Sequence, residues 1–263
     1  MTSLAIGSFD AIHIAHQELI KKADGVLVIE HHRATITPGW KRSKYTNKPT
    51  FFYLLENIKH LSPKEFIAKL ERDFPTLKKI VVGYDFKFGK NASGDVKTLQ
   101  ELFSGVVEVV EEIKVEGISV HSRVIRELIK NSNIALANKL LGRNYTIDGE
   151  QIKGLGLGSK ELVPTINLKV KNYTLPNGVF ATNTIIDGNK HQSITFIGKR
   201  VSVDNAFSVE THILENFRLK KYSDIEIEFV ELLRGNLKFE SLEELKKQIQ
   251  RDIYARRNPF FII

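Results

Sequence analysis

Two histidines one helical turn apart lie close to the N-terminus of the chain. Residues 7–16 read GSFDAIHIAH; they follow an apolar run, residues 4–6, and lead into a helix-like stretch, residues 17–22. This order predicts a strand, a turn and a helix start. A helix start presents unpaired backbone N–H groups and the positive end of the helix dipole, so His13 and His16 would face a docked anion. We expect a nucleotide phosphate there. Surface histidines at an ordinary strand–helix turn are the alternative, which the preceding G-x-F-D makes weaker.

A second set of residues suited to phosphate chemistry lies past the middle of the chain. Gly154, Gly156 and Gly158 leave backbone N–H groups open to close approach by phosphates. Thr165 and Asn167 stand two apart on an expected strand, which places two oxygen ligands for Mg²⁺ on one face. A flexible hairpin loop and a turn at a strand start are the alternatives that these residues alone leave open.

Composition and charge limit the classes of protein to which this chain can belong. A length of 263 residues fits one large domain or two modest ones, and we expect two. The chain has no cysteine, which excludes disulfides, cysteine metal sites and thiol catalysis and favours the cytoplasm. It shows no leader-like start and no run approaching roughly 18 apolar residues, so we expect a soluble protein with no membrane partner. The net charge of +8 favours polyanionic ligands. The basic residues are scattered and lack interleaved aromatic residues, so we do not expect nucleic acid as a partner. The sequence does not determine the oligomeric state.

The first half alternates short β-branched runs with stretches of helical period. The strand-like runs are residues 26–29, 80–82 and 106–110, and the helix-like stretches are residues 51–59, 63–72 with Ser62 as cap, and 95–103. Apolar strands separated by helices indicate a parallel, doubly wound sheet. Ligands bind beyond the carboxyl ends of such strands, so the turns after residues 4–6 and 80–82 would face one crevice.

The pattern changes near Gly142. Helix-like stretches give way to closely spaced strand-like runs with turn signals between them. The helix-like stretches are residues 121–130 and 133–141, and the strand-like runs are residues 145–147, 165–170, 179–186, 193–197, 208–214 and 225–233. This half indicates a small antiparallel β-barrel, followed by a helix over residues 242–256 that Ser241 would cap. We expect a first domain over residues 1–141 and a second over residues 142–263.

Several further motifs occur along the chain in a fixed order. They are GSFDAIHIAH at 7–16, VGYDFKFG at 82–89, VHSRVIR at 120–126, LLGRNY at 140–145, KGLGLGSKELVPTIN at 153–167, PNGVFA at 176–181 and VETHI at 209–213, with Leu233-Arg234 and Lys238-Phe239. Together they resemble the bacterial bifunctional riboflavin kinase/FAD synthetase family over nearly the whole chain. Any one motif alone is weak, whereas their joint occurrence in order is hard to obtain by chance.

This resemblance implies a fold and two reactions. Residues 1–141 would form an α/β nucleotidyltransferase-like domain with a Rossmann-like parallel sheet, and residues 142–263 a riboflavin kinase barrel. The barrel would phosphorylate riboflavin with ATP to give FMN. The α/β domain would then transfer an adenylyl group from ATP to FMN, giving FAD and pyrophosphate. Both reactions would use Mg²⁺ with ATP as co-substrate, and the small-molecule partners are riboflavin, FMN and ATP.

The resemblance also assigns roles to residues. Glu210 would be the general base for the riboflavin 5′-hydroxyl. The phosphate of FMN is already ionised and needs no base, so His13, His16 and Arg126 would stabilise the charge that develops as pyrophosphate leaves. The metal ligands would be Thr165 and Asn167. Contacts to nucleotide or flavin would come from Gly7, Phe9, Asp10, Asp85, Ser122, Arg123, Gly154, Gly156, Gly158, Lys160, Asn167 and Arg234.

The chain departs from the family pattern at the first site. Ala11 and Ala15 stand where the family has glycine, and His121 and Arg123 replace small hydroxyl residues. The methyl group of Ala15 would crowd ATP at the helix start. Two alternatives therefore stay open. One is a riboflavin kinase with a degenerate adenylyltransferase domain, and the other is a flavin- or RNA-binding regulator without chemistry, against which the intact kinase residues argue.

Overall fold

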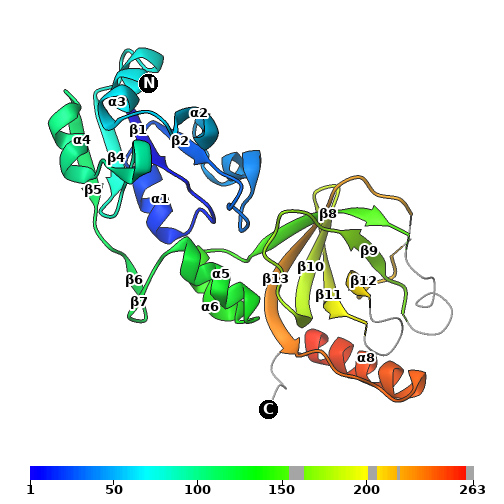
Figure 1. Cartoon of the computed structure of the whole chain (residues 1–263). Helices are drawn as coiled ribbons and strands as arrows, with labels where there is room; N and C mark the ends of the chain where they lie inside the picture. Colours follow the sequence, from blue (N-terminus) through cyan, green and yellow to red (C-terminus); the bar gives the residue numbers. More distant parts are fainter. Residues whose placement is uncertain (154–162, 201–205, 218–219, 259–263) are drawn as a thin grey trace. The chain divides into compact units, whose positions relative to one another are not determined.

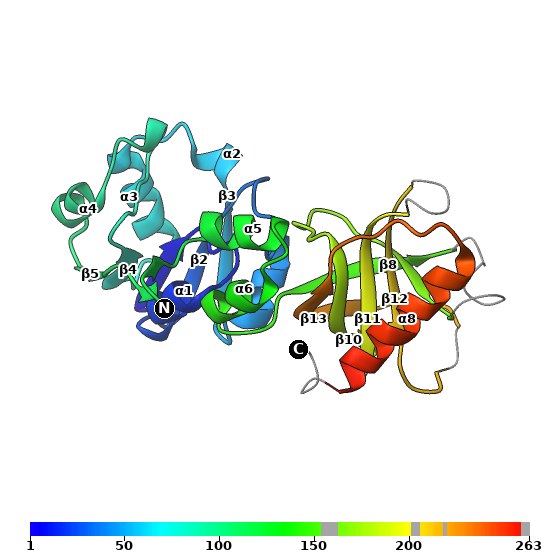
Figure 2. The same cartoon turned by 90° about the horizontal axis from the view of Figure 1, so that it is seen from below.

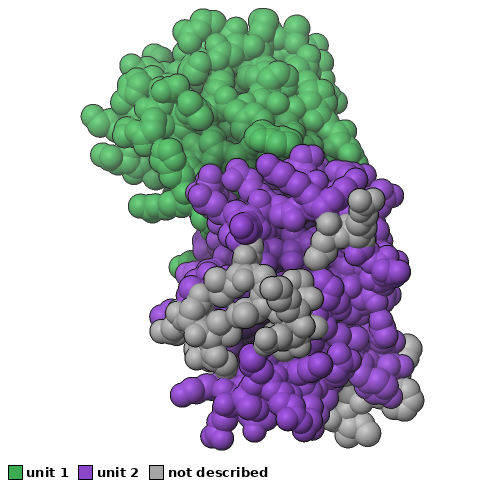
Figure 3. Space-filling model, turned by 90° about the vertical axis from the view of Figure 1, so that its right-hand side faces the viewer, with its two compact units in different colours: residues 1–125 green, residues 126–263 purple. Residues whose placement is uncertain are grey.

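The computed structural model describes residues 1–153, 163–200, 206–217 and 220–258. Four residues predicted to contact nucleotide or flavin lie outside this part of the chain: Gly154, Gly156, Gly158 and Lys160. The chain divides into two compact units, Met1–Ile125 and Arg126–Ile263 (Figure 3). This division falls within a helix, α5 (Ser122–Lys130). The domain boundary after residue 141 remains a prediction.

The first unit is built on a parallel sheet, as the sequence predicts, and the sheet has five strands. Its strands are β1 (Ser3–Gly7), β2 (Gly25–Glu30), β3 (Thr50–Leu54), β4 (Lys79–Gly83) and β5 (Val106–Val110). Their order across the sheet is β3-β2-β1-β4-β5, and every neighbouring pair is parallel. The turns after β1 and β4 therefore lie at the same edge of the sheet. The strand order reverses between these two strands, and open α/β sheets bind ligands at such a point.

Helices cover both faces of this sheet (Figure 1). They are α1 (Ile14–Lys21), α2 (Leu55–Ile58), α3 (Pro63–Asp73) and α4 (Val96–Leu102). Leu4 and Ile6 of β1 pack in one cluster with buried side chains of α2, α3 and α4. Ala5, which lies between them, packs with Leu19 and Ile20 of α1. Because successive side chains of a strand point to opposite faces, this division gives a three-layer, doubly wound core.

Side-chain caps fix where two of these helices begin. The Ser62 hydroxyl accepts a hydrogen bond from the Glu65 backbone N–H, and the Glu65 carboxylate accepts one from the Ser62 backbone N–H, which forms a capping box. Asp95 caps α4 by accepting from the Thr98 N–H. The shorter elements of this unit are η1 (Gly39–Tyr45), η2 (Lys90–Ala92), β6 (Lys114–Val115) and β7 (Ile118–Ser119).

The helix predicted over residues 51–59 is wrong in its first half. Thr50–Leu54 forms β3, which pairs in parallel with β2, and only Leu55–Ile58 is helical. Three consecutive aromatic residues, 51–53, favour an extended strand. Pairing with β2 also satisfies the backbone hydrogen-bonding groups of this segment. Strand pairing therefore overrides the helical periodicity.

The second unit contains a closed antiparallel barrel, as predicted, and also α6 (Ile134–Leu141), a helix that the sequence predicts but within the first domain. Its strands are β8 (Thr146–Ile152), β9 (Ile166–Lys169), β10 (Gly178–Ile186), β11 (Asn189–Lys199), β12 (Phe207–Ile213) and β13 (Ile225–Arg234). Neighbours follow the order β10-β11-β12-β9-β8-β13. Asp187 and Gly188 join β10 to β11 with φ values of 49° and 81°, which is typical of an Asp-Gly hairpin turn.

A long helix, α8 (Leu242–Arg257), lies along the outside of the barrel and contacts β11 and β13 (Figures 1 and 2). Ser241 caps it by accepting a hydrogen bond from the Glu244 N–H, as predicted. Arg256 of this helix donates from Nη2 to Asn183 Oδ1 of β10 at 2.9 Å. Among the described helices, none is long and apolar enough to cross a membrane.

Candidate active sites

The turn between β1 and α1 holds the two histidines predicted to bind phosphate. His13 is the N-cap of α1, and its Nδ1 accepts a hydrogen bond from the His16 backbone N–H at 3.2 Å. An accepting Nδ1 leaves the proton of the neutral imidazole on Nε2. The two rings stack with 3.5 Å between their centroids. The structure therefore brings both histidines together at a helix start, where the helix dipole favours anions.

Asp10 is buried and anchors this turn. Its carboxylate accepts hydrogen bonds from the backbone N–H groups of Thr35 (3.2 Å), Ile36 (3.0 Å) and Thr37 (2.9 Å). These bonds hold the loop after β2 against the turn. The Asp10 backbone carbonyl accepts from the Ser122 hydroxyl at 2.5 Å, which brings the start of α5 to the same turn. The contacts predicted between these two residues and a nucleotide remain predictions.

Arg42, which sequence reasoning missed, is fully buried and also holds the turn. Its Nη1 donates to the Ser8 carbonyl at 2.6 Å, its Nε donates to the Gly39 carbonyl at 3.1 Å, and its Nη2 pairs with the Glu30 carboxylate. Burial lowers the pKa of Arg42, and the charges of Glu30 and Asp10 oppose that shift. Every nitrogen of this guanidinium thus has a partner, as a buried charge requires.

Three residues of the turn have left-handed backbone angles: Phe9 (φ 50°), Ala11 (φ 83°) and Ile12 (φ 44°). For residues other than glycine this conformation costs about 1 kcal/mol or more. Ala11 therefore occupies a position where glycine would be unstrained. The Phe9 ring is buried, packs edge-on against His16 at 5.1 Å and lies against Gly7, where an added Cβ would approach the ring to 3.4 Å. Gly7 and the buried Phe9 ring thus pack against each other inside the turn.

A partly exposed cluster follows β4. The Tyr84 hydroxyl hydrogen-bonds His121 Nε2 at 3.2 Å, and His121 Nδ1 lies 3.9 Å from Asp85 Oδ2. Desolvation, followed by the charges of Glu112 and Asp85, raises the pKa of Tyr84. Asp85, a predicted ligand contact, therefore lies beside His121, one of the departures from the family pattern.

The two arginines predicted to contact phosphate lie on α5. Arg123 is exposed and belongs to the first unit, and Arg126 belongs to the second unit. Their roles at the first site remain predictions.

A cavity of about 500 Å³ lies between the end of β2, α2, α3 and the loop after β4. Its wall combines aromatic and aliphatic side chains with lysines: Ile29, Leu55, Phe86, Phe88, Lys59, Lys87 and Lys90. Because β2 and β4 flank β1 in the sheet, this cavity and the histidine turn occupy the carboxyl ends of neighbouring strands. Sequence reasoning missed the cavity, although the two phenylalanines of the VGYDFKFG motif are the signal that could have found it.

In the barrel, Glu210 of β12 is paired directly with Asn167 of β9 in antiparallel register. Directly opposed residues point to the same face, with Cβ atoms about 5 Å apart. Thr165 lies just before β9, and its Oγ1 accepts a long hydrogen bond from Asn167 Nδ2 at 3.5 Å. The structure therefore brings the predicted base and both predicted metal ligands together on one face.

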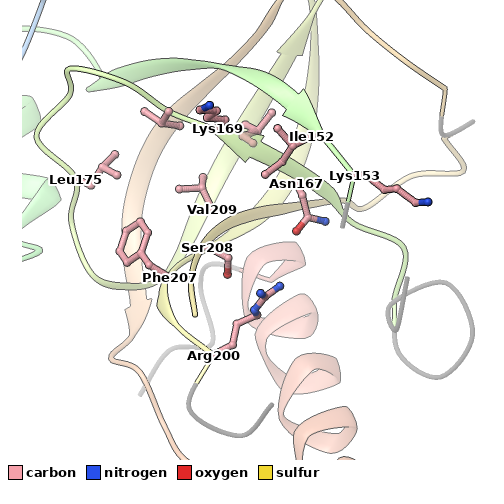
Figure 4. A pocket seen from close by; sticks show the side chains of 11 residues that line it. Ile152, Lys153, Asn167, Lys169, Leu175, Arg200, Phe207, Ser208 and Val209 are labelled. Atoms are coloured by element: carbon pink, nitrogen blue, oxygen red, sulfur yellow. The ribbon is translucent and has the colours of Figure 1, made fainter. Parts of the chain in front are cut away.

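Arg200 joins this group. Its Nη1 donates to Glu210 Oε1 at 3.3 Å, and the two side chains are 18% and 21% exposed. Arg200 and Asn167 line a cavity of about 330 Å³ together with Lys153 and Ser208 (Figure 4). Sequence reasoning missed Arg200 because nothing in the pattern distinguishes it among the 39 lysines and arginines.

Two further sets of hydrogen bonds connect the elements of the barrel unit. His212 Nδ1 donates to the Pro164 carbonyl at 2.8 Å, which ties β12 to the turn before Thr165. Burial lowers the pKa of His212. Arg234, a predicted nucleotide contact, donates from Nε and Nη2 to the buried carboxylate of Asp252 at 3.0 and 2.9 Å and so fastens α8 to β13. Its predicted contact with nucleotide remains a prediction.

The chemistry of Thr165 and Asn167 fits Mg²⁺. A hydroxyl and an amide oxygen are hard, neutral donors, which suit an ion that keeps several waters and is held largely by substrate phosphates. Within the described ranges, no cluster of three or more His, Cys, Asp or Glu side chains could hold a metal ion. Thr165 and Asn167 are the residues that would hold Mg²⁺ together with the phosphates of ATP.

The sequence matches two family models, one described as riboflavin kinase over residues 141–260 and one described as FAD synthetase over residues 47–124. A bifunctional riboflavin kinase/FMN adenylyltransferase of Pseudomonas fluorescens is 31% identical over 285 residues, covering 96% of this chain and 91% of the relative. The protein of the same name from Buchnera aphidicola subsp. Schizaphis graminum is 28% identical over 298 residues, covering 100% and 95%. A crystal structure described as a macrolide-efflux protein from Streptococcus pneumoniae shares the fold, with a TM-score of 0.86 at 24% identity over 98% of this chain and 94% of that one. The chain belongs to the bifunctional riboflavin kinase/FMN adenylyltransferase family.

Proposed function

We propose that this protein makes FAD from riboflavin in two steps, one in each unit. In the barrel, riboflavin and ATP give FMN and ADP. In the α/β unit, FMN and a second ATP give FAD and pyrophosphate. The observation that carries the proposal is the pairing of Glu210 with Asn167 on one face of the barrel. We place both reactions in the cytoplasm, since a chain without cysteine suits a reducing compartment.

In the kinase step, Glu210 accepts the proton of the riboflavin 5′-hydroxyl as its oxygen attacks the γ-phosphorus of ATP. The bond from that phosphorus to the bridging oxygen breaks, and ADP leaves. Arg200 donates to Glu210 and so orients the carboxylate. Mg²⁺ held by Thr165 and Asn167 would neutralise charge on the phosphates.

In the adenylyl transfer, an oxygen of the FMN phosphate attacks the α-phosphorus of ATP, and pyrophosphate leaves. The nucleophile is already ionised, so the site needs donors that stabilise developing negative charge. In this proposal His13 Nε2–H and the start of α1, where His13 is the N-cap, supply them. The imidazole of His16, stacked on that of His13, extends the same surface.

The cavity of about 500 Å³ in the first unit is the proposed flavin site of this second reaction. Phe86 and Phe88 offer aromatic walls for the flavin ring, and Lys59 and Lys87 offer cations for its phosphate. The loop that carries these phenylalanines lies within the segment matched by the FAD synthetase model.

Product analysis tests the proposal. The purified protein is incubated with Mg²⁺-ATP and either riboflavin or FMN, and the flavins are separated by chromatography. We expect FAD from both substrates. FMN without FAD would leave only the kinase, an alternative that the match to the FAD synthetase model and the bifunctional relatives do not favour. No conversion of either flavin would contradict both assignments.

A further inference from the structure

The cavity on the barrel contains one hydroxyl that the proposed mechanism does not use. Ser208 lies on β12, two residues before Glu210, and lines the cavity of about 330 Å³ with Asn167 and Arg200 (Figure 4). Its Oγ is buried and has no hydrogen-bond partner among the residues that the structure describes. Buried hydroxyls in folded proteins nearly always have a partner, and a buried one without a partner is destabilising. A substrate group that enters the cavity is the candidate partner.

Ser208 and Glu210 share one face of β12. Val209 and Thr211, which alternate with them, are buried in the barrel. Across the strand pair, Ser208 stands opposite Gly198 of β11. Because glycine has no side chain, β11 offers nothing there to cover the hydroxyl. A molecule in this cavity therefore lies beside Ser208, Asn167 and Arg200, and Arg200 contacts Glu210 next to the cavity.

The strand register shows on which side of Glu210 this hydroxyl lies. On β9, Ile166 stands opposite Thr211 and Asn167 stands opposite Glu210, so the direction from Thr165 to Asn167 leads along β12 toward Ser208. Ser208 therefore lies beyond Glu210 on the side away from Thr165. In phosphoryl transfer the attacking oxygen, the phosphorus and the leaving oxygen are roughly in line. With the phosphates of ATP on the Thr165 side, an acceptor that attacks in line approaches from the Ser208 side.

We propose that the Ser208 hydroxyl hydrogen-bonds a secondary hydroxyl of the ribityl chain and so selects flavins that carry this chain intact. The inference rests on the proposed kinase function. With the 5′-hydroxyl at Glu210, the remaining ribityl hydroxyls follow within about 6.6 Å, the distance between alternate residues of a strand. Each of them donates and accepts, as a serine hydroxyl does. Ser208 is thus a specificity-determining residue rather than part of the proton transfer.

Kinetics of FMN formation with flavin analogues test this inference. Riboflavin and its 2′-, 3′- and 4′-deoxy forms are compared in the wild type, Ser208→Ala and Ser208→Thr. Ser208→Ala should raise the KM for riboflavin about tenfold, because one hydrogen bond typically contributes about that factor to affinity. It should change kcat less than about twofold. Ser208→Thr keeps the hydroxyl and should restore the KM.

One deoxyflavin identifies the partner hydroxyl. Replacing riboflavin with this deoxyflavin should raise the KM of the wild type by a similar factor. It should not raise the KM of Ser208→Ala further, because that variant already lacks the hydrogen bond. Ser223→Ala removes an exposed serine of the same unit and should leave both constants unchanged. Ser208→Cys, of similar size, provides a second variant if Ser208→Ala does not fold.

An unchanged KM in folded Ser208→Ala, or losses that add fully for every deoxyflavin, would overturn the inference. A thermal unfolding transition equal to that of the wild type shows that each variant is folded, because conversion of FMN to FAD takes place in the first unit and does not report on the barrel. Failure of the wild type to phosphorylate riboflavin would instead contradict the proposed function, so the two failures are distinguishable.

Discussion

Glu210 of β12 stands directly opposite Asn167 of β9 on the outer face of the barrel. The group proposed to take the proton and a group proposed to hold Mg²⁺ therefore lie about 5 Å apart at their Cβ atoms. Arg200, which follows the end of β11, contacts the same carboxylate. Residues of β9, of β12 and of the segment after β11 thus converge on one site, because strand pairing in the closed barrel brings these segments together.

Asn167→Ala should impair metal use in the barrel alone. Removing one oxygen ligand is expected to raise the Mg²⁺ concentration for half-maximal FMN formation about tenfold or more. Conversion of FMN to FAD should keep its Mg²⁺ dependence. Magnesium titrations of both reactions measure this, with Asn189→Ala as the control because Asn189 is an exposed asparagine of the same barrel. An equal shift in both reactions would argue against a ligand role for Asn167.

His13→Asn should slow FAD formation and spare FMN formation. Asparagine is a good N-cap residue, so α1 keeps its cap, but the imidazole N–H is lost. Loss of one donor to developing charge is expected to slow FMN-to-FAD conversion about a hundredfold. Rates of both reactions measure this, with the exposed His32→Asn as a matched control. If FAD forms at a rate within about threefold of wild type, His13 does not bind the triphosphate.

Asp10→Ala should destabilise the first unit. The change leaves the N–H groups of Thr35, Ile36 and Thr37 without their acceptor inside the protein. The expected loss in the free energy of unfolding is roughly 3 kcal/mol. Denaturant unfolding measures it, and Glu101→Ala, which removes an exposed carboxylate of the same unit, should change stability by less than about 0.5 kcal/mol. Equal stabilities of the two variants would show that Asp10 does not anchor the turn.

Acid should weaken the barrel through His212. Burial holds the pKa of His212 below its ordinary 6.5; the hydrogen bond to Pro164 opposes this shift, and Arg257 adds to it. The unfolded chain therefore binds the proton more readily than the folded one. Above about pH 6.5 His212 is neutral in both the folded and the unfolded chain and does not change the free energy of unfolding. As the pH falls below that value, the unfolded chain takes up the proton first, and the free energy of unfolding decreases. Unfolding of wild type and His212→Gln from about pH 8 to pH 5 should give a shallower decline for the variant, whereas parallel curves would contradict the effect.

Local patterns predicted most of the fold. The six barrel strands, the Asp-Gly hairpin and the Ser62 and Ser241 caps follow from two-residue alternation and short-range chemistry, and all are present. Arg42 and the cavity of the first unit were missed because they depend on contacts between segments that are separated in the sequence, and Arg200 was missed because nothing distinguishes it among the lysines and arginines. The sequence carries no local signal for such contacts.

The barrel core shows a second limit of pattern-based prediction. Five hydroxyl side chains are fully buried there and hydrogen-bond one another at 2.7–3.0 Å: Thr182, Thr184, Ser193, Thr195 and Thr211. A hydrophobic pattern assigns such residues to the surface. Mutual hydrogen bonding removes the cost of burying them, and only the three-dimensional arrangement supplies those partners.

Glu210→Gln tests the central claim, that the two reactions belong to separate units, most directly. An amide cannot accept the proton of the 5′-hydroxyl, so FMN formation from riboflavin should fall roughly a thousandfold. Conversion of FMN to FAD in the same preparation should keep its wild-type rate, and a thermal unfolding transition equal to that of the wild type shows that the barrel is folded. Loss of both activities in a folded variant, or retention of FMN formation, would contradict the account.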